Sequence, residues 1–126
     1  MEKLIDAARL AQSNSYAPYS KYKVGAAVLT DDNTIISGCN VESSSYSLTC
    51  CAERTALFSA VSKGYHKFKA LAIITKDGGT PCGACRQVIW DLCGDIPIYI
   101  AYENGKVDET TSKALLPKAF NSSLLK

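Results

Sequence analysis

The chain has 126 residues, of which 14 are basic and 12 acidic, for a formal net charge of +2. A chain of this length suits a single domain, here residues 1–126, which buries about two thirds of the surface that its unfolded form exposes. The two charge signs are interspersed, which argues against a surface for nucleic acid and favours small substrates.

The first residues, Met1–Asp6, place charges where a secretion signal needs an apolar core. No apolar run approaches the ~20 residues that span a membrane. Six cysteines in such a chain are better explained as thiols or metal ligands than as a disulfide framework. We therefore expect a cytoplasmic protein that does not bind membranes.

The first half of the chain predicts a helix followed by a hairpin. Leu4, Ile5, Ala8 and Ala11 recur at helical spacing, and residues 14–18 end the helix. Residues 24–29 and 34–38 read as two antiparallel strands joined by a turn at 31–33. A polar loop, residues 39–46, follows, and such loops often carry function.

The second half alternates helices and strands. A helix over 52–61 precedes a continuously apolar strand, 68–74, of the kind covered on both faces in a mostly parallel sheet. Further elements are expected in this order: a helix from Pro81 to Cys93, a strand over 96–102, an edge strand around Val107 and a short helix over 113–116. The order αββαβαββα predicts an α/β fold, a three-layer α/β/α sandwich with a five-stranded mixed sheet.

Two cysteine motifs point to a metal. They are Cys51-Ala52-Glu53-Arg54 and Pro81-Cys82-Gly83-Ala84-Cys85. The segment between them is long enough to finish a helix, form one strand and enter a second helix, so the motifs can meet. Three thiolates suit Zn²⁺, which keeps a fourth position for water when it is catalytic. Cys51, Cys82 and Cys85 are the predicted ligands of one zinc ion per chain, whereas Cys50 is rotated ~100° around the helix and should point elsewhere.

Helix N-termini should favour these thiolates. If Thr49 and Thr80 cap the two helices, Cys51 and Cys82 both occupy second helical positions, where the helix dipole stabilises negative charge. Arg54 can offset the excess charge of three thiolates over Zn²⁺.

Glu53 is the predicted proton carrier. A zinc rich in thiolate is a weak Lewis acid, so a dedicated base is needed, and Glu53 sits at the same helix start as Cys51. The alternative explanation is a first-turn acid that only complements the helix dipole. The flanking cysteines favour catalysis, because this pattern of three ligands beside a glutamate that is not a ligand is the zinc deaminase signature.

Three stretches together resemble cytidine deaminase of the small homotetrameric class: Gly38–Glu42, Cys51–Ala56 and Pro81–Gln87. The resemblance extends to Leu115–Phe120 and covers nearly the whole chain. It implies zinc-dependent hydrolytic deamination of cytidine and deoxycytidine to uridine and deoxyuridine, with release of ammonia, in pyrimidine salvage. It also implies free pyrimidine nucleosides as partners and a homotetramer with shared active sites.

The resemblance further implies a role for particular residues. Asn40 and Glu42 would bind the ribose 3′-hydroxyl, and Ala52 and Glu53 the edge of the base. Arg54 would hydrogen-bond a ligand thiolate. Tyr22, where the family often has Phe, would face the base, and Phe120 would lie against the base at a subunit boundary. Ser44 and Tyr46 would reach the active site of a neighbouring subunit near the 5′-hydroxyl.

Three alternatives remain open on the sequence. A deaminase for another aminated base or cytosine-containing nucleoside would use the same zinc chemistry, although Asn40 and Glu42 favour a ribose. A structural zinc module would use Cys50 or Cys39 as a fourth ligand, since structural sites are closed. A polynucleotide editor is disfavoured by the balanced charge and by cysteine where many such enzymes carry His.

Overall fold

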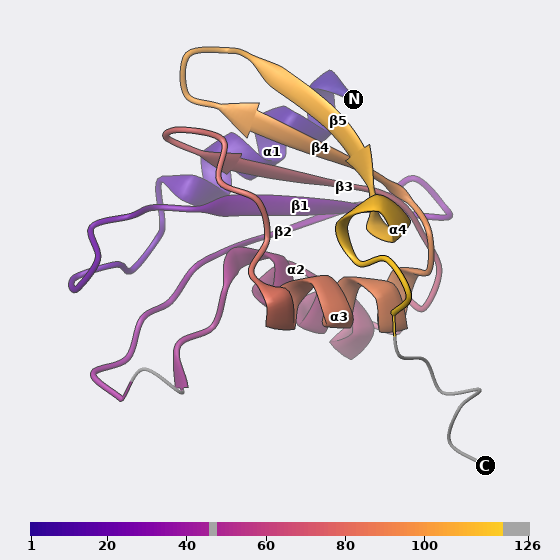
Figure 1. Ribbon diagram of the computed structural model, residues 1–126, viewed down its shortest axis with the longest axis horizontal. Coiled ribbons are helices and arrows are strands. Elements are labelled where there is room, and N and C mark those ends of the chain that lie inside the picture. The colour runs from indigo at the N-terminus through magenta and orange to yellow at the C-terminus, as the bar shows by residue number, and fades with distance from the viewer. Residues whose placement is uncertain (46–47, 120–126) are drawn as a thin grey trace.

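The computed structural model describes residues 1–45 and 48–119 (Figure 1). Its elements run in the order predicted from the sequence: α1 (Glu2–Gln12), β1 (Gly25–Thr30), β2 (Ile35–Cys39), α2 (Ala52–Ser62), β3 (Phe68–Thr75), α3 (Gly83–Cys93), β4 (Pro97–Tyr102), β5 (Val107–Thr111) and α4 (Ser112–Leu115). No helix in the described residues is long and apolar enough to cross a membrane.

The strands form one five-stranded mixed sheet in the order β2-β1-β3-β4-β5. β1 and β2 form the expected antiparallel hairpin, and β5 lies antiparallel to β4 at the opposite edge. β3 runs antiparallel to β1 and parallel to β4. The prediction of a mostly parallel sheet around 68–74 was therefore wrong. That strand is apolar because it is central and covered on both faces, not because its neighbours are parallel.

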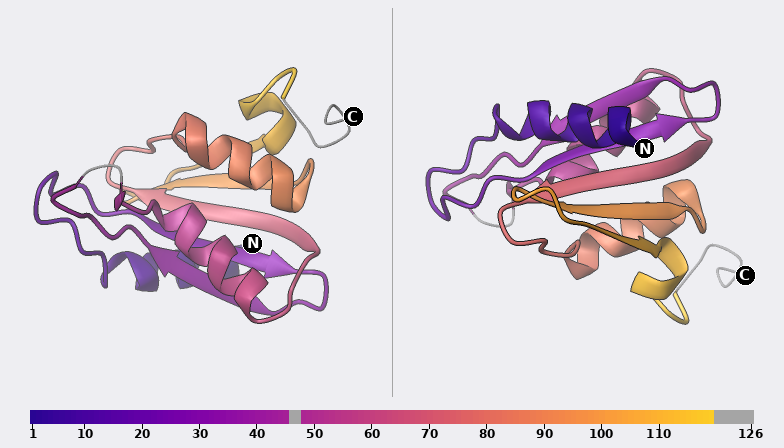
Figure 2. Two further views of the ribbon diagram at one scale, coloured as in Figure 1. Left: turned by 90° about the horizontal axis from the view of Figure 1, so that it is seen from below. Right: turned by 90° about the horizontal axis from the view of Figure 1, so that it is seen from above.

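Helices cover both faces of the sheet, which confirms the three-layer sandwich. Figure 2 shows α2 and α3 over one face and α1 over the other. The core under α1 contains Leu4, Ile5 and Ala8 packed with small residues of β1 and β3. The core under α2 is larger and includes Leu57, Leu71 and Ile98, all fully buried.

Two glycines let the helices approach the sheet closely. A Cβ on Gly25 would collide with the backbone of α1 at Ala8, and one on Gly38 would lie 2.5 Å from the amide nitrogen of Ala56 in α2. Glycine at these positions therefore sets the spacing between layers.

Candidate functional site

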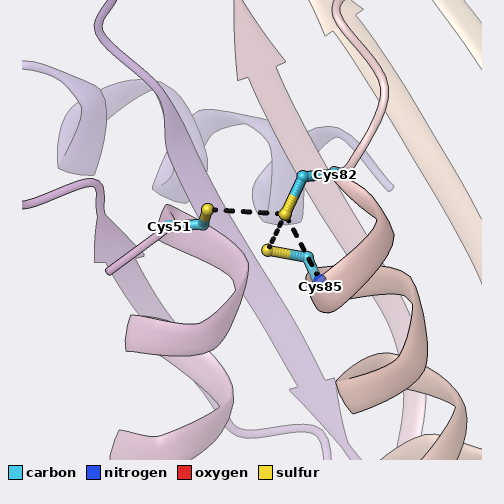
Figure 3. A group of neighbouring side chains, drawn as sticks. All are labelled: Cys51, Cys82 and Cys85. Atoms are coloured by element: carbon cyan, nitrogen blue, oxygen red, sulfur yellow. Dashed lines mark hydrogen bonds between the residues drawn. The ribbon is translucent and has the colours of Figure 1, made fainter. Parts of the chain in front are cut away.

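Three sulfur atoms meet where α2 and α3 begin. The Sγ atoms of Cys51, Cys82 and Cys85 all lie within 4.8 Å of one another (Figure 3). The Sγ of Cys82 is 3.8 Å from that of Cys51 and 3.2 Å from that of Cys85. The two cysteine motifs thus meet as the sequence predicted, with β3 as the strand between them.

The cysteines themselves are the helix caps, each two residues after the threonine that was expected in this position. Cys51 and Cys82 are the N-cap residues of α2 and α3, both with extended backbone, and the Cys82 sulfur accepts a hydrogen bond from the Cys85 amide at 3.4 Å. The prediction that Thr49 and Thr80 are caps was wrong, because their hydroxyls have other partners. The hydroxyl of Thr49 accepts from the Ser43 amide, and that of Thr80 accepts from Arg86.

The three sulfurs fit a zinc ion. Thiolates at ~2.3 Å from a tetrahedral zinc lie ~3.8 Å apart, which is the separation of the Cys51 and Cys82 sulfurs. They are the one cluster of three or more potential metal ligands in residues 1–45 and 48–119. Neither Cys50 nor Cys39 belongs to the cluster, so a closed four-cysteine structural site is not formed. The Cys50 sulfur accepts instead from the Thr55 hydroxyl at 3.5 Å.

Electrostatics at the cluster favour thiolate at Cys51. Hydrogen bonding from the Cys85 thiol, assisted by Arg54, lowers the pKa of Cys51 to about 5. The same interaction raises the pKa of Cys85, which holds the proton. The Nη2 of Arg54 lies 3.5 Å from the Cys51 sulfur, and this contact raises the pKa of the guanidinium. Arg54 therefore lies against the sulfur of one of the three clustered cysteines.

Glu53 is buried beside the cluster. Its side chain is 3% exposed, and burial raises the pKa of its carboxyl group above the usual value. A raised pKa brings a carboxyl group closer to the range in which it can both accept and donate a proton near neutral pH. Such a group is suited to general acid–base catalysis.

A cavity of about 310 Å³ opens onto these groups. Its lining brings together two of the predicted ligands, the proton carrier and four of the predicted substrate-binding residues: Cys51, Cys82, Glu53, Tyr22, Asn40, Glu42 and Ala52. The third ligand, Cys85, is fully buried behind them. The cavity thus joins the metal site to a space large enough for a small molecule.

Asn40 and Glu42 are held by hydrogen bonds. The Nδ2 of Asn40 donates to the Tyr22 carbonyl oxygen at 2.8 Å, and its Oδ1 accepts from the Val24 amide at 3.0 Å. One carboxylate oxygen of Glu42 accepts from the amides of Tyr19 and Ser20 at 3.0 and 3.1 Å, and the other accepts from the Ser20 hydroxyl. The Ser20 bonds lower the pKa of Glu42. Both side chains are therefore fixed at the cavity wall.

The remaining predicted site residues lie elsewhere. Ser44 is exposed in the loop after β2 and does not line this cavity. Tyr46 and Phe120 lie outside the described residues. Cys93 packs against the core, where burial raises its pKa to about 12, as expected for a structural cysteine.

Arg86 and Asp77 were not predicted as site residues. The Nε of Arg86 donates to the Pro81 carbonyl oxygen at 2.8 Å, and its Nη1 donates to the Leu115 carbonyl oxygen at 2.9 Å. The turn before Cys82 is thereby tied to the end of α4. Asp77 accepts from the hydroxyl of Tyr22. The position of Arg86 directly after the second cysteine motif was the available signal, whereas nothing local marks Asp77.

The chain has close relatives in both sequence and structure. A family model described as the cytidine and deoxycytidylate deaminase zinc-binding region matches residues 1–100. The chain is 52% identical over 124 residues to the cytidine deaminase of Sporosarcina psychrophila, covering 96% of this chain and 91% of that protein. It is 47% identical over 122 residues to that of Halalkalibacterium halodurans, covering 94% and 92%. The crystal structure of cytidine deaminase from Burkholderia pseudomallei matches with a TM-score of 0.90 at 46% identity, covering 94% of this chain and 98% of that one.

Proposed function

The chain belongs to the cytidine and deoxycytidylate deaminase family, and on this basis we propose that it hydrolyses cytidine and deoxycytidine to uridine and deoxyuridine. The reaction consumes one water and releases ammonia. The observation that carries the proposal is that a buried glutamate, Glu53, lines the same cavity as the cysteine cluster. A metal site that opens onto a substrate-sized space beside a proton carrier is suited to hydrolysis.

Cys51, Cys82 and Cys85 would hold the zinc. When bound, zinc supplies the Lewis acidity that makes a water molecule nucleophilic near neutral pH. The residues around the cysteines tune the charge on their sulfur atoms. Arg54 draws electron density from the Cys51 sulfur through its contact at 3.5 Å. The thiolate set then donates less negative charge to the metal.

Glu53 moves the protons. Its carboxylate accepts a proton from the attacking water, and the carboxyl group then protonates the ring nitrogen next to the amine-bearing carbon. Glu53 then accepts the proton of the hydroxyl group that has been added to this carbon and delivers it to the amine, so that the carbon–nitrogen bond breaks, ammonia leaves and the carbonyl group of uridine forms. One side chain thus acts as base and acid in turn. Its raised pKa suits both roles, because burial disfavours the carboxylate and makes it a stronger base.

The cavity favours a free nucleoside over a nucleotide. None of the described residues that line it is basic, while Glu42 and Glu53 contribute carboxyl groups. A 5′-phosphate would enter without a cationic partner and against the charge of Glu42. Asn40 and Glu42 offer the hydrogen-bonding groups that a ribose hydroxyl needs. We therefore assign free pyrimidine nucleosides, rather than deoxycytidylate or a polynucleotide, as substrates.

We also propose a homotetramer with shared active sites and a cytoplasmic location. Tyr46, Phe120 and the exposed Ser44 would complete a neighbouring subunit's cavity. Exposed apolar side chains at Leu48 and Phe58, 73% and 49% accessible, are consistent with burial between subunits. Light scattering on the active protein tests the assembly, and an active monomer would contradict it.

The six free cysteines favour a reducing compartment, which agrees with the proposed cytoplasmic location.

The activity is tested with the purified, zinc-loaded protein. Incubation with cytidine should deplete the ultraviolet band of the cytosine ring and release ammonia in equal amount to the uridine formed. Cytidine 5′-monophosphate and deoxycytidylate serve as comparison substrates and should react far more slowly. Absence of turnover with cytidine at full zinc content would contradict the proposal.

A further inference from the structure

One wall of the cavity is formed by a tyrosine whose hydroxyl group is bound to a distant loop. The Oη of Tyr22 donates to the Oδ1 of Asp77 at 2.5 Å, across 55 positions of the sequence. Tyr22 lies between α1 and β1, whereas Asp77 lies in the loop between β3 and α3. The bond joins the segment that forms the cavity wall to the loop that leads into Cys82.

The loop makes room for this hydroxyl. An added Cβ at Gly79 would lie only 2.6 Å from the Tyr22 Oη. The Gly79 amide donates to the Thr75 hydroxyl at 2.8 Å, which fixes the loop where the tyrosine meets it. Gly79 does not need a left-handed backbone, since its φ lies outside the range that only glycine adopts readily. Glycine is therefore required here because it has no side chain, and the hydroxyl of Tyr22 occupies the volume that a side chain would fill.

Tyr22 is held at both ends. Its carbonyl oxygen accepts from the Nδ2 of Asn40 at 2.8 Å, and its hydroxyl is bound to Asp77. The ring between these two anchors lines the cavity together with Thr75 and Gly79. Burial and the bond to Asp77 raise the pKa of Tyr22, so the hydroxyl keeps its proton and remains a donor near neutral pH. A phenylalanine at this position would lack the second anchor.

We propose that Asp77 is a positioning residue that fixes the Tyr22 ring against the pyrimidine of the substrate. Gly79, which has no side chain, leaves room for the phenol hydroxyl beside Asp77. The inference rests on the proposed nucleoside deaminase activity. Asp77 acts through Tyr22 and does not touch the reacting atoms. Its loss therefore weakens binding of the base and leaves the proton transfers of Glu53 in place.

The test compares kinetics and product binding in zinc-loaded variants. Asp77→Ala should raise KM for cytidine and Kd for uridine about three- to tenfold, the effect of losing one hydrogen bond, with kcat within about twofold of the parent. Asp77→Asn keeps an oxygen that accepts from the phenol and should restore most of the affinity. Asp32→Ala is the matched control, because Asp32 accepts from the hydroxyl of Thr30 in the turn after β1 and does not line the cavity. It should leave KM unchanged.

Double variants separate positioning from general loop damage. In a Tyr22→Phe background, Asp77→Ala should have no further effect, because the bond is already gone. Gly79→Ala should raise KM in the parent but much less in Tyr22→Phe, where the added methyl group enters the space left by the hydroxyl. An unchanged KM in Asp77→Ala, or equal effects of Asp77→Ala in both backgrounds, would overturn the inference while the parent still deaminates cytidine. A parent without cytidine turnover would overturn the proposed function itself.

Discussion

The Nη2 of Arg54 lies 3.5 Å from the Sγ of Cys51, three residues earlier at the start of α2. Residues three apart share one face of a helix, so the N-cap position of Cys51 places its sulfur beside the guanidinium. The same nitrogen lies 3.3 Å from the Thr49 carbonyl oxygen, which holds the side chain against the cluster. Three thiolates carry one negative charge more than zinc neutralises, and Arg54 is the cation placed to offset it.

Arg54→Gln should keep zinc but lower kcat/KM for cytidine. Loss of the charge-assisted hydrogen bond leaves more electron density on Cys51 and makes the metal a weaker Lewis acid, an effect of about 10- to 100-fold for partners of metal ligands. Metal analysis and steady-state kinetics on the same preparation provide the measurement. Unchanged turnover at unchanged zinc content would show that Arg54 serves only the structure.

Replacement of the cysteines should divide them into two sets. Alanine at Cys51, Cys82 or Cys85 should reduce zinc from one ion per chain to nearly none, because each removes a ligand from a site with three. Alanine at Cys50 or Cys93 should leave the zinc content unchanged. Zinc loss in Cys50→Ala combined with retention in Cys51→Ala would contradict the ligand set.

Arg86 should control how firmly zinc is held. Its bonds to the Pro81 carbonyl oxygen and the Thr80 hydroxyl fix the turn just before Cys82. Arg86→Lys keeps the charge but cannot make these bonds together with the one to Leu115, so a chelator should remove zinc about 10-fold faster. Arg9→Lys, an exposed change on α1, is the control. Equal release rates in the two variants would exclude this role for Arg86.

The order of the elements could be predicted from the sequence because apolar spacing reports burial locally. The clustering of the three cysteines could be predicted too, because Cys82 and Cys85 are three residues apart and the segment between the two motifs is long enough to bring Cys51 beside them. The helix starts could not, because Thr49 and Thr80 have the residue type of caps while their hydroxyls bind Ser43 and Arg86 instead. Contacts such as that between Tyr22 and Asp77 depend on how two loops meet in space, and no local pattern encodes them.

Glu42 should remain ionised to lower pH than an ordinary glutamate. The Ser20 hydroxyl, the Ser20 amide and the Tyr19 amide all donate to its carboxylate, and these bonds lower its pKa from the ordinary 4.5. A lowered pKa means that the stabilisation is complete above pH 4.5 and is lost as the pH falls through the folded-state pKa. Ser20→Ala removes the largest contribution and should raise the pKa of Glu42. Carboxyl-carbon NMR titration measures this shift, and an equal pKa of Glu42 in both proteins would contradict the assignment.

Glu53→Gln separates catalysis from structure at the centre of the site. Glutamine has nearly the same size as glutamate and can still hydrogen-bond, so zinc content, fold and assembly should all be retained. It cannot carry a proton, and Glu53 is assigned several successive transfers, so deamination should fall by at least ~100-fold.

Binding of uridine provides the second readout, because ground-state contacts of the base do not require proton transfer. Its Kd should change far less than kcat in Glu53→Gln. Glu109→Gln, the same chemical change at an exposed position on β5, should leave both quantities at the parent value. The 3% exposure of Glu53 makes its carboxyl group the one buried acid of the described chain. If the Glu53→Gln protein deaminates cytidine at the parent rate, some other group moves the protons and the mechanism assigned to this cavity is wrong.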